Sequence, residues 1–333
     1  MAPLTMAAPA LACVTIAGMS RIHHWRHVAS GIAFVSLSFC LSSGVSVAGA
    51  QSGAPARPAA GAAAPTWDED WTRDFPPFRI IGNVYWVGSY DLSTYLITTP
   101  QGHILVNTGV GDTAQQIKAR VERLGFKMSD VRMLTSTHGH VDHVAGIGEL
   151  KKLTGAEVWI EERDKDLLET GGKTDFVFGA RESMHFPPVR VDHTFKDGDT
   201  LKVGNVTLTA HLHAGHTRGA TSFTFDVSEN GRTYHVIIAN MGSINPGVKV
   251  SGMPTYPGIT ADYAHTFMAQ KELKVDVFLA SHASQFKLHD KYKPGDPYDP
   301  NRFVDPDLYL SSVRQLEKTY QEQLARERAG QPR

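Results

Sequence analysis

The sequence predicts a layered α/β domain. Segments typical of strands and segments typical of helices alternate through both halves of the 333-residue chain, and no short repeat of fixed period links them. The first 50 residues have the composition of a leader, and removing them from the 333 leaves 283. That length is sufficient for one large domain with its own hydrophobic core.

Residues 1–50 resemble a secretory signal. They contain no acidic residue, and Arg21 and Arg26 are their only formal cations. The segment from Val28 to Val47 is almost wholly small or apolar, and Ala48-Gly49-Ala50 forms a small-residue cleavage pattern. We therefore expect a signal peptide that is removed on export to the periplasm, which leaves a protein with no stable membrane association.

Two other interpretations of this segment remain open. In a lipoprotein, Cys40 would carry the lipid, although Phe39 is bulkier than such a signal requires. An uncleaved membrane anchor is the second alternative, since the apolar run is near the length of a membrane span but is diluted by Ser and Gly. Residues 51–66 are rich in Ala and Pro and predict a linker, followed by the folded domain at 67–327 and a short tail at 328–333.

The charge and cysteine content of the mature chain exclude several classes of protein. Removing residues 1–50 removes two of the 33 basic residues and none of the 34 acidic ones, which leaves a net charge of about −3. The sequence has no basic patch of the kind that would indicate a nucleic-acid partner. Both cysteines, Cys13 and Cys40, lie in the leader, so the mature protein has no disulfide and no thiolate ligand. We expect a monomer that binds a small-molecule substrate.

The domain is expected to begin with strands and one helix. Apolar, partly β-branched segments separated by turns such as Gln101-Gly102 predict strands at 78–87, 94–98 and 103–106. Asp112 and Gln115 form a capping box, and apolar residues then recur at helical spacing until Gly125.

The remainder of the domain is richer in strands. A strand at 131–135 leads into a histidine-rich loop, and apolar residues at helical spacing after the loop predict a helix from Val144 to Gly155. Further strands are expected at 156–160, in several short pieces between 189 and 227, at 234–239 and at 275–280. The chain closes with a helix whose apolar face carries Tyr309, Val313, Leu316, Tyr320 and Leu324.

The loop after residue 135 has a composition typical of a metal site. His138-Gly139-His140-Val141-Asp142-His143 places four possible ligands in six residues. Protonated imidazoles would repel one another there, whereas a divalent cation draws them together as neutral donors. Imidazole combined with one carboxylate suits zinc, although other first-row metals also fit.

Further ligands are expected from later strand ends. Gly215-His216-Thr217 and Ser281-His282-Ala283 each follow an apolar strand, the same context as the first motif. From the residues alone, a role for His216 and His282 as ligands is as plausible as an ordinary structural role. His211 and His213 are alternatives to His216, but their alternation with apolar residues predicts an exposed strand face.

The chain resembles the metallo-β-lactamase superfamily across most of residues 75–325. The resemblance rests on the HxHxDH motif at 138–143 together with His216 and His282. It implies a four-layer αβ/βα sandwich, in which two mixed sheets lie face to face with outer helices and metals at one edge. It also implies two Zn²⁺ ions, the first held by His138, His140 and His216, and the second by Asp142, His143 and His282.

Local features of the sequence are most similar to the third subclass of class B β-lactamases. The mature chain has no Cys to bind the second zinc, His138 is retained, and the segment 238–247 contains no carboxylate to bridge two metals. The resemblance implies hydrolysis of penicillins, cephalosporins or carbapenems, hence antibiotic resistance, with Asp142 in a catalytic role. The alternatives are another hydrolase of this fold, such as a lactonase or thioesterase, and a non-catalytic metal-binding protein.

Two positions depart from the superfamily's usual pattern. Asn107 stands where Asp is usual, and we expect its carbonyl to accept a hydrogen bond from a ligand histidine. Met241 stands where a polar residue is common, which leaves Ser243, with Asn245, as the candidates for binding the substrate carboxylate.

Overall fold

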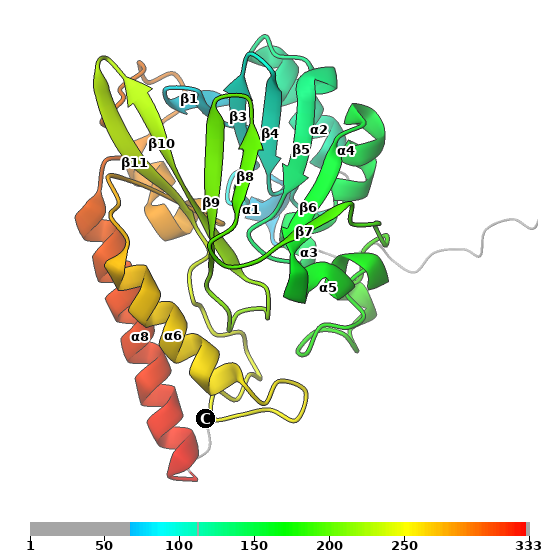
Figure 1. Ribbon diagram of the computed structural model, residues 1–333, viewed down its shortest axis with the longest axis vertical. Coiled ribbons are helices and arrows are strands. Elements are labelled where there is room, and N and C mark those ends of the chain that lie inside the picture. The colour runs from blue at the N-terminus through cyan, green and yellow to red at the C-terminus, as the bar shows by residue number, and fades with distance from the viewer. Residues whose placement is uncertain (1–66, 112, 331–333) are drawn as a thin grey trace, which may run out of the picture. The chain divides into compact units, whose positions relative to one another are not determined.

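The computed structural model describes residues 67–111 and 113–330 of the chain. Two mixed β-sheets lie face to face, with α2 and α4 on the outer side of the first sheet and α6 and α8 beside the second (Figure 1). The fold class expected from the resemblance, a sandwich of two mixed sheets flanked by helices, is confirmed. The expected signal peptide and linker, and Asp112 of the predicted capping box, lie outside the described residues.

The first sheet has the order β1-β2-β3-β4-β5-β6-β7, antiparallel from β1 to β4 and parallel from β4 to β7. Its strands are β1 (Phe78–Ile81), β2 (Val84–Trp86), β3 (Tyr95–Thr99), β4 (Gly102–Val106), β5 (Val131–Thr135), β6 (Glu157–Glu161) and β7 (His193–Phe195). The second sheet has the order β12-β11-β10-β9-β8, in which only β11 and β12 are parallel. Its strands are β8 (Thr200–Val203), β9 (Val206–Leu212), β10 (Thr221–Glu229), β11 (Arg232–Ala239) and β12 (Val277–Ala280).

The helices differ widely in length. They are α1 (Glu69–Thr72), α2 (Thr113–Arg123), α3 (Val141–Val144), α4 (Ile147–Thr154), α5 (Lys165–Thr170), α6 (Ile259–Glu272), α7 (Leu288–Lys291) and α8 (Pro306–Arg328). The long helices α6 and α8 pack against each other, and α8 also contacts β12. Within the described residues, no helix is both long and apolar enough to cross a membrane.

Two hydrophobic cores explain the layers. One fills the space between the sheets and extends under α6 and α8, with inward-facing residues such as Ile104, Phe223 and Val236. The other lies between the first sheet and its helices, and includes Leu105 and Ile117. Neighbours such as Ile104 and Leu105 therefore belong to different cores, since successive side chains of a strand point to opposite faces.

Three of the differences from the sequence prediction concern one strand and two helices. The strand expected at 78–87 is a hairpin of β1 and β2, because Gly82 adopts the left-handed conformation at φ 52°. The helix expected from Val144 is interrupted at Ala145 and Gly146, between α3 and α4. Helix α6 was not expected, because polar Thr266 and Gln270 share its buried side and mask the apolar period.

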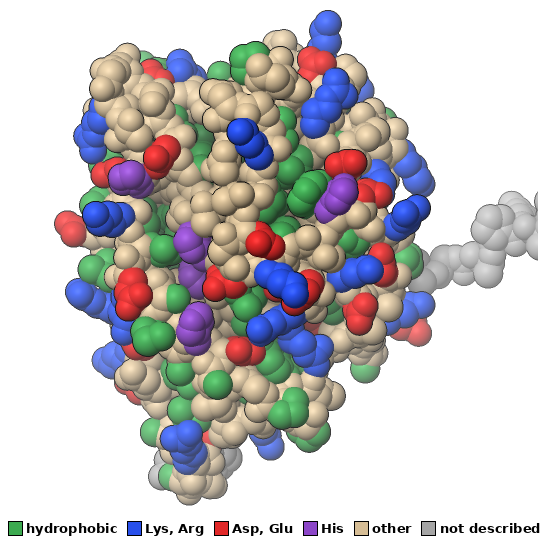
Figure 2. All heavy atoms as spheres, viewed as in Figure 1, with side chains coloured by type: hydrophobic (Ala, Val, Ile, Leu, Met, Phe, Trp, Pro, Cys, Tyr) green, Lys and Arg blue, Asp and Glu red, His purple; other side chains and the backbone are tan. Residues whose placement is uncertain are grey.

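Charged side chains of both signs are interspersed over the face seen in Figure 2, and neither sign forms a continuous patch there. This distribution agrees with the near balance of 33 basic and 34 acidic residues in the whole chain.

Candidate metal centre

The candidate ligands come from three segments that follow strands. His138 and His140 lie in the loop after β5, and Asp142 and His143 follow in the short helix α3. His216 lies between β9 and β10, and His282 directly after β12. Strands β5 and β12 belong to different sheets, so the centre forms where the ends of both sheets meet.

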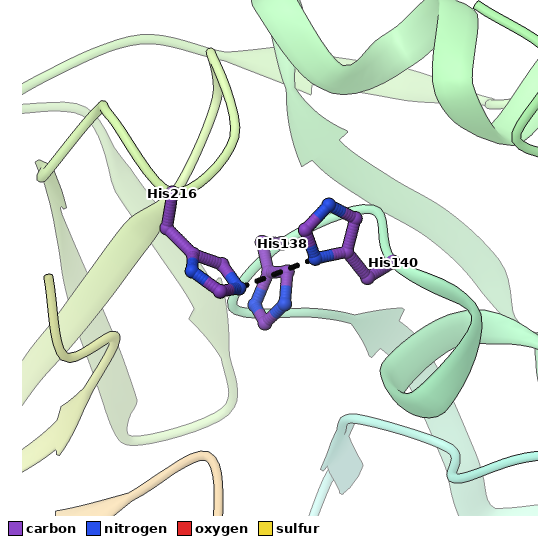
Figure 3. Close-up of side chains that lie close together, drawn as sticks. All are labelled: His138, His140 and His216. Atoms are coloured by element: carbon purple, nitrogen blue, oxygen red, sulfur yellow. Dashed lines mark hydrogen bonds between the residues drawn. The ribbon is translucent and has the colours of Figure 1, made fainter. Parts of the chain in front are cut away.

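Three histidines point toward one another (Figure 3). Nδ1 of His140 lies 3.2 Å from Nε2 of His216, and the ring of His138 is 4.8 Å from the ring of His140 and 4.7 Å from that of His216. One nitrogen from each of the three lies within 4.8 Å of the others. The structure thus brings together the set expected for the first zinc.

A second group of donors adjoins the first. Oδ2 of Asp142 lies 3.0 Å from Nε2 of His143 and 3.4 Å from Nε2 of His282. Burial alone would raise the pKa of Asp142, but His143 and His282 outweigh it and hold this pKa well below its usual range. The carboxylate is therefore negatively charged, as a metal ligand must be.

The donor set fits a zinc ion. Among the described residues, the buried Nε2 of His138 has no hydrogen-bond partner, although the ring lies against the imidazoles of His140 and His216. Burial, together with neighbouring His143, lowers the pKa of His138 well below its usual value, and burial together with His140 lowers that of His216 to about 3. Both rings are thus neutral, which is the form that binds a metal, and Zn²⁺ accepts nitrogen and oxygen donors of this kind.

Outer partners orient three of the imidazoles. Oδ2 of Asp175 lies 3.1 Å from Nε2 of His140, Oδ2 of Asp91 lies 2.9 Å from Nδ1 of His282, and the carbonyl of Ser243 lies 2.9 Å from Nδ1 of His216. Each contact occupies the nitrogen that faces away from the centre and so fixes the ring. The sequence did not indicate Asp91 or Asp175, because nothing in their own surroundings marks them.

Asp164 connects two of the ligand-bearing loops. This fully buried carboxylate accepts hydrogen bonds from the Gly139 N–H at 2.9 Å, the Thr217 hydroxyl at 2.6 Å and the Gly219 N–H at 2.7 Å. Gly139 stands between His138 and His140, and Thr217 follows His216. The positions of the first three histidines therefore depend on one side chain.

The hydrogen-bond partner that the sequence predicted for Asn107, a ligand histidine, was wrong. Its Oδ1 accepts hydrogen bonds from the Thr137 N–H at 2.9 Å and the Ser136 hydroxyl at 3.0 Å, not from a ligand histidine. Asn107 directly follows β4, the strand beside β5, and is fully buried with φ 63°. Its side chain therefore supports the chain just before His138. It acts on the backbone of the loop and not on an imidazole.

The alternatives to His216 lie elsewhere. The prediction that His213 faces solvent was wrong: it is buried, and its Nδ1 lies 2.6 Å from the Ser222 hydroxyl. His211 is partly buried and lies 2.6 Å from the Thr224 hydroxyl. Neither belongs to the cluster that contains His216.

The two candidate substrate-binding residues lie on the loop after β11. The Ser243 hydroxyl is 3.2 Å from Nδ1 of His216, so it lies at the edge of the centre. Asn245 is two residues further along, and its buried Nδ2 has no hydrogen-bond partner within the part of the chain that the structure describes.

Residues 90–229 match the profile of the metallo-beta-lactamase superfamily. Among solved structures, the chain is similar to a beta-lactamase from Chitinophaga pinensis, with 45% identity, a TM-score of 0.76, and coverage of 78% of this chain and 98% of that one. It is also similar to the class B3 di-zinc metallo-beta-lactamase LRA-12 from an Alaskan soil metagenome, with 44% identity, a TM-score of 0.75, and coverage of 78% and 98%.

Matches to curated proteins are shorter. Over 114 residues the chain is 32% identical to the hydroxyacylglutathione hydrolase GloC of Haemophilus influenzae. This match covers 34% of this chain and 51% of that protein. A hydroxyacylglutathione hydrolase of Jannaschia sp. is 29% identical over 136 residues, or 40% of this chain and 43% of that protein. The chain thus spans about half or less of the curated relatives it matches.

This protein belongs to the metallo-beta-lactamase superfamily and is a hydrolase of that superfamily with a histidine-rich metal-binding site. Within the superfamily, the solved structures similar to this chain include class B3 metallo-beta-lactamases, as the sequence predicted.

Proposed function

We propose that this protein is a periplasmic dizinc β-lactamase that opens the amide of penicillins, cephalosporins or carbapenems and so confers antibiotic resistance. The observation that carries the proposal is the composition of the centre: His143 and His282 adjoin Asp142, and the loop after β11 offers neither Cys nor carboxylate. The 45% identity to a beta-lactamase over nearly all of that chain supports the same substrate class.

The mechanism follows from the placement of the charged and neutral donors. A bound zinc ion lowers the pKa of a coordinated water to about 7 and polarises a carbonyl group. His138, His140 and His216 would hold the first ion, and Asp142, His143 and His282 the second. The Asp142 carboxylate, kept ionised by His143 and His282, would supply the negative charge of the second site and orient the attacking water by accepting a hydrogen bond from it. Ser243 and Asn245 are the candidates for holding the substrate carboxylate.

A second candidate function is thioester or lactone hydrolysis. The partial matches to hydroxyacylglutathione hydrolases favour it. Against it stands the segment 238–247, which has no carboxylate to bridge two metals.

Assays of the zinc-loaded mature chain separate the two functions. We expect turnover of the chromogenic cephalosporin nitrocefin that EDTA abolishes and zinc restores, with much slower turnover of a glutathione thioester. The reverse preference would make the protein a thioesterase of the same fold.

The metal content tests the proposed ligand set. Three protein ligands per ion predict about two zinc ions per chain. His216→Ala should lower the zinc content and nitrocefin turnover together, whereas His211→Ala should leave both unchanged. Full zinc content in the His216 variant would remove this residue from the centre.

Export is tested separately. N-terminal sequencing of the exported protein should show a chain that begins near Gln51, whereas a lipid-modified Cys40 at its start would identify a lipoprotein.

A further inference from the structure

Three polar side chains form a buried stripe along helix α6. Tyr263, Thr266 and Gln270 lie three and four residues apart, so they share one side of the helix, and all three are fully buried. A buried polar group costs free energy unless it has a hydrogen-bond partner. The partners of these three side chains therefore show what this polar stripe holds in place.

Two members of the polar stripe hold the surroundings of His216. The Thr266 hydroxyl donates a hydrogen bond to the carbonyl of Ala214 at 2.7 Å, in the turn that carries His216. The Tyr263 hydroxyl donates to the carbonyl of Ser243 at 3.0 Å. That carbonyl also lies 2.9 Å from Nδ1 of His216, so one acceptor connects the helix with the outer nitrogen of a candidate ligand.

The third member holds the neighbour of His138. Nε2 of Gln270 donates to the carbonyl of Asn240 at 2.8 Å, and the N–H of Asn240 donates to the Ser222 hydroxyl at 2.9 Å. The side-chain nitrogen of Asn240 lies 3.0 Å from Nδ1 of His138. Asn240 is thus fixed through both of its backbone groups, and its side chain limits how far the ring of His138 can turn.

Two glycines allow the helix to lie directly against these loops. A Cβ atom at Gly215, which precedes His216, would be 2.8 Å from the ring of Tyr263. A Cβ atom at Gly242, in the loop after β11, would be 2.9 Å from the ring of Phe267. Both separations are shorter than a real Cβ contact, so glycine permits this close approach. Packing and hydrogen bonds therefore fix the same two loops on the helix.

We propose that α6 is the element that positions the first zinc site. Its three buried polar side chains hold the neighbours of His138 and His216 through the backbone of the loops, so they are positioning residues and not catalytic ones. A metal binds more tightly when its ligands are already held in place, because less conformational freedom is lost on binding. This assignment rests on the proposed zinc ligands and holds whichever substrate the protein hydrolyses.

Paired substitutions separate positioning from stability. Thr266→Val removes one hydroxyl of the polar stripe and keeps the shape of the side chain, whereas Thr266→Ser keeps the hydroxyl. Tyr263→Phe removes the other hydroxyl. Tyr309→Phe is its matched control, because the buried Tyr309 hydroxyl also donates to a carbonyl, that of Gln270 at 2.9 Å, but this carbonyl belongs to α6 itself and not to a loop near a ligand.

Each protein is titrated with zinc in competition with a chromophoric chelator, and its zinc-free form is unfolded with urea. We expect Thr266→Val and Tyr263→Phe to lower the zinc affinity by about tenfold, the lower end of the loss seen when an outer partner of a metal ligand is removed. Thr266→Ser and Tyr309→Phe should bind zinc as the wild type does. Tyr309→Phe should nevertheless lower the urea midpoint as much as Tyr263→Phe, since each loses one buried hydroxyl.

Wild-type zinc affinity in Thr266→Val and Tyr263→Phe, or an equal loss of affinity in Tyr309→Phe, would overturn the role of the polar stripe and leave the proposed function standing. If the wild type binds zinc but does not turn over nitrocefin, the β-lactamase proposal fails, and the zinc affinities of the variants still decide the role of the stripe. If the wild type binds no zinc, both proposals fail.

Discussion

Individual side chains determine which nitrogen of each imidazole is available to a metal. His140 directs Nδ1 inward because Asp175 holds Nε2, whereas His282 directs Nε2 toward Asp142 because Asp91 holds Nδ1. A neutral imidazole carries one hydrogen, so an acceptor at the outer nitrogen leaves the inner one free to bind. Asp91 and Asp175 therefore make the rings specific donors.

Asp142→Asn tests the charge of the second metal site. The amide keeps the size of the side chain but removes the negative charge that lies between His143 and His282. We expect the zinc content to fall toward one ion per chain, and kcat for nitrocefin to fall by about a hundredfold, the scale of losing one preorganised electrostatic group. Metal analysis and steady-state kinetics measure the two effects. A variant with one zinc and normal kcat would show that the first site alone suffices.

Glu161 gives a prediction for the pH dependence of stability. Burial raises the pKa of this carboxyl from 4.5 to about 7, although the Arg163 N–H opposes the shift. The folded protein therefore holds a proton that the unfolded chain releases near pH 4.5. This proton contributes its full stabilisation of the folded state below pH 4.5, and the stabilisation is lost as the pH rises through 7.

Glu161→Gln removes this titration, because the amide is neutral at every pH and keeps an oxygen to accept from Arg163. The free energy of unfolding of the variant minus that of the wild type should therefore increase by on the order of 1–2 kcal/mol as the pH is raised from 5 to 8. Urea denaturation of both proteins at the two pH values measures the gain. If the free energies of unfolding of the two proteins differ by the same amount at both pH values, Glu161 does not titrate in this range.

Among the structural elements, the loops that carry the ligands depend on contacts with other segments. Asp164, between β6 and α5, accepts hydrogen bonds from both the loop after β5 and the loop after β9. A buried carboxylate with three donors offers acceptors that an amide cannot match, since one amide atom is itself a donor.

Asp164→Asn should therefore loosen both loops. We expect zinc affinity to fall by about ten- to a hundredfold and the free energy of unfolding to fall by about 1–3 kcal/mol. Competition with a chromophoric chelator measures the affinity. Asp192→Asn is the control, since Asp192 also accepts a backbone N–H, from Val158 at 2.8 Å, but contacts no ligand loop. Equal zinc affinity in both variants would limit Asp164 to a structural role.

The sequence predicts an element when the residues that determine it lie close together in the chain. Strand β5 and the motif after it could be predicted because apolar periodicity and ligand spacing lie within a dozen residues. Asp164 could not, because its partners are up to 55 residues away. The choice of His216 over His213 depends on which side of the turn after β9 faces the metals, and His213 is instead buried against Ser222. Helix α6 carries a buried Gln270 that bonds to the carbonyl of Asn240, a contact that its own sequence does not indicate.

At the scale of the whole domain, the metal centre joins the two sheets at one edge. The loop after β5 belongs to the first sheet, and the segments with His216 and His282 follow strands of the second. Hydrogen bonds also link these parts of the two sheets: the hydroxyls of Thr137 and Ser281 lie 2.9 Å apart, and the Thr221 N–H donates to the Thr137 carbonyl at 2.8 Å. Metal bound at the centre would add a link whose strength depends on zinc concentration.

Zinc removal should therefore destabilise the domain unevenly. A ligand that binds only the folded state stabilises it by about 2.7 kcal/mol at a hundred times its dissociation constant. For a domain of this size that corresponds to a fall in Tm on the order of 5–10 °C when EDTA removes the metal. Hydrogen exchange should then increase at residues 136–143, 213–219 and 281–285, which hold the candidate ligands, and remain slow in β10 and β11, whose pairing does not involve the centre. Exchange that increases equally in β10 and β11 would mean that zinc stabilises the fold only globally, and that the sheets are not joined locally through the metal centre.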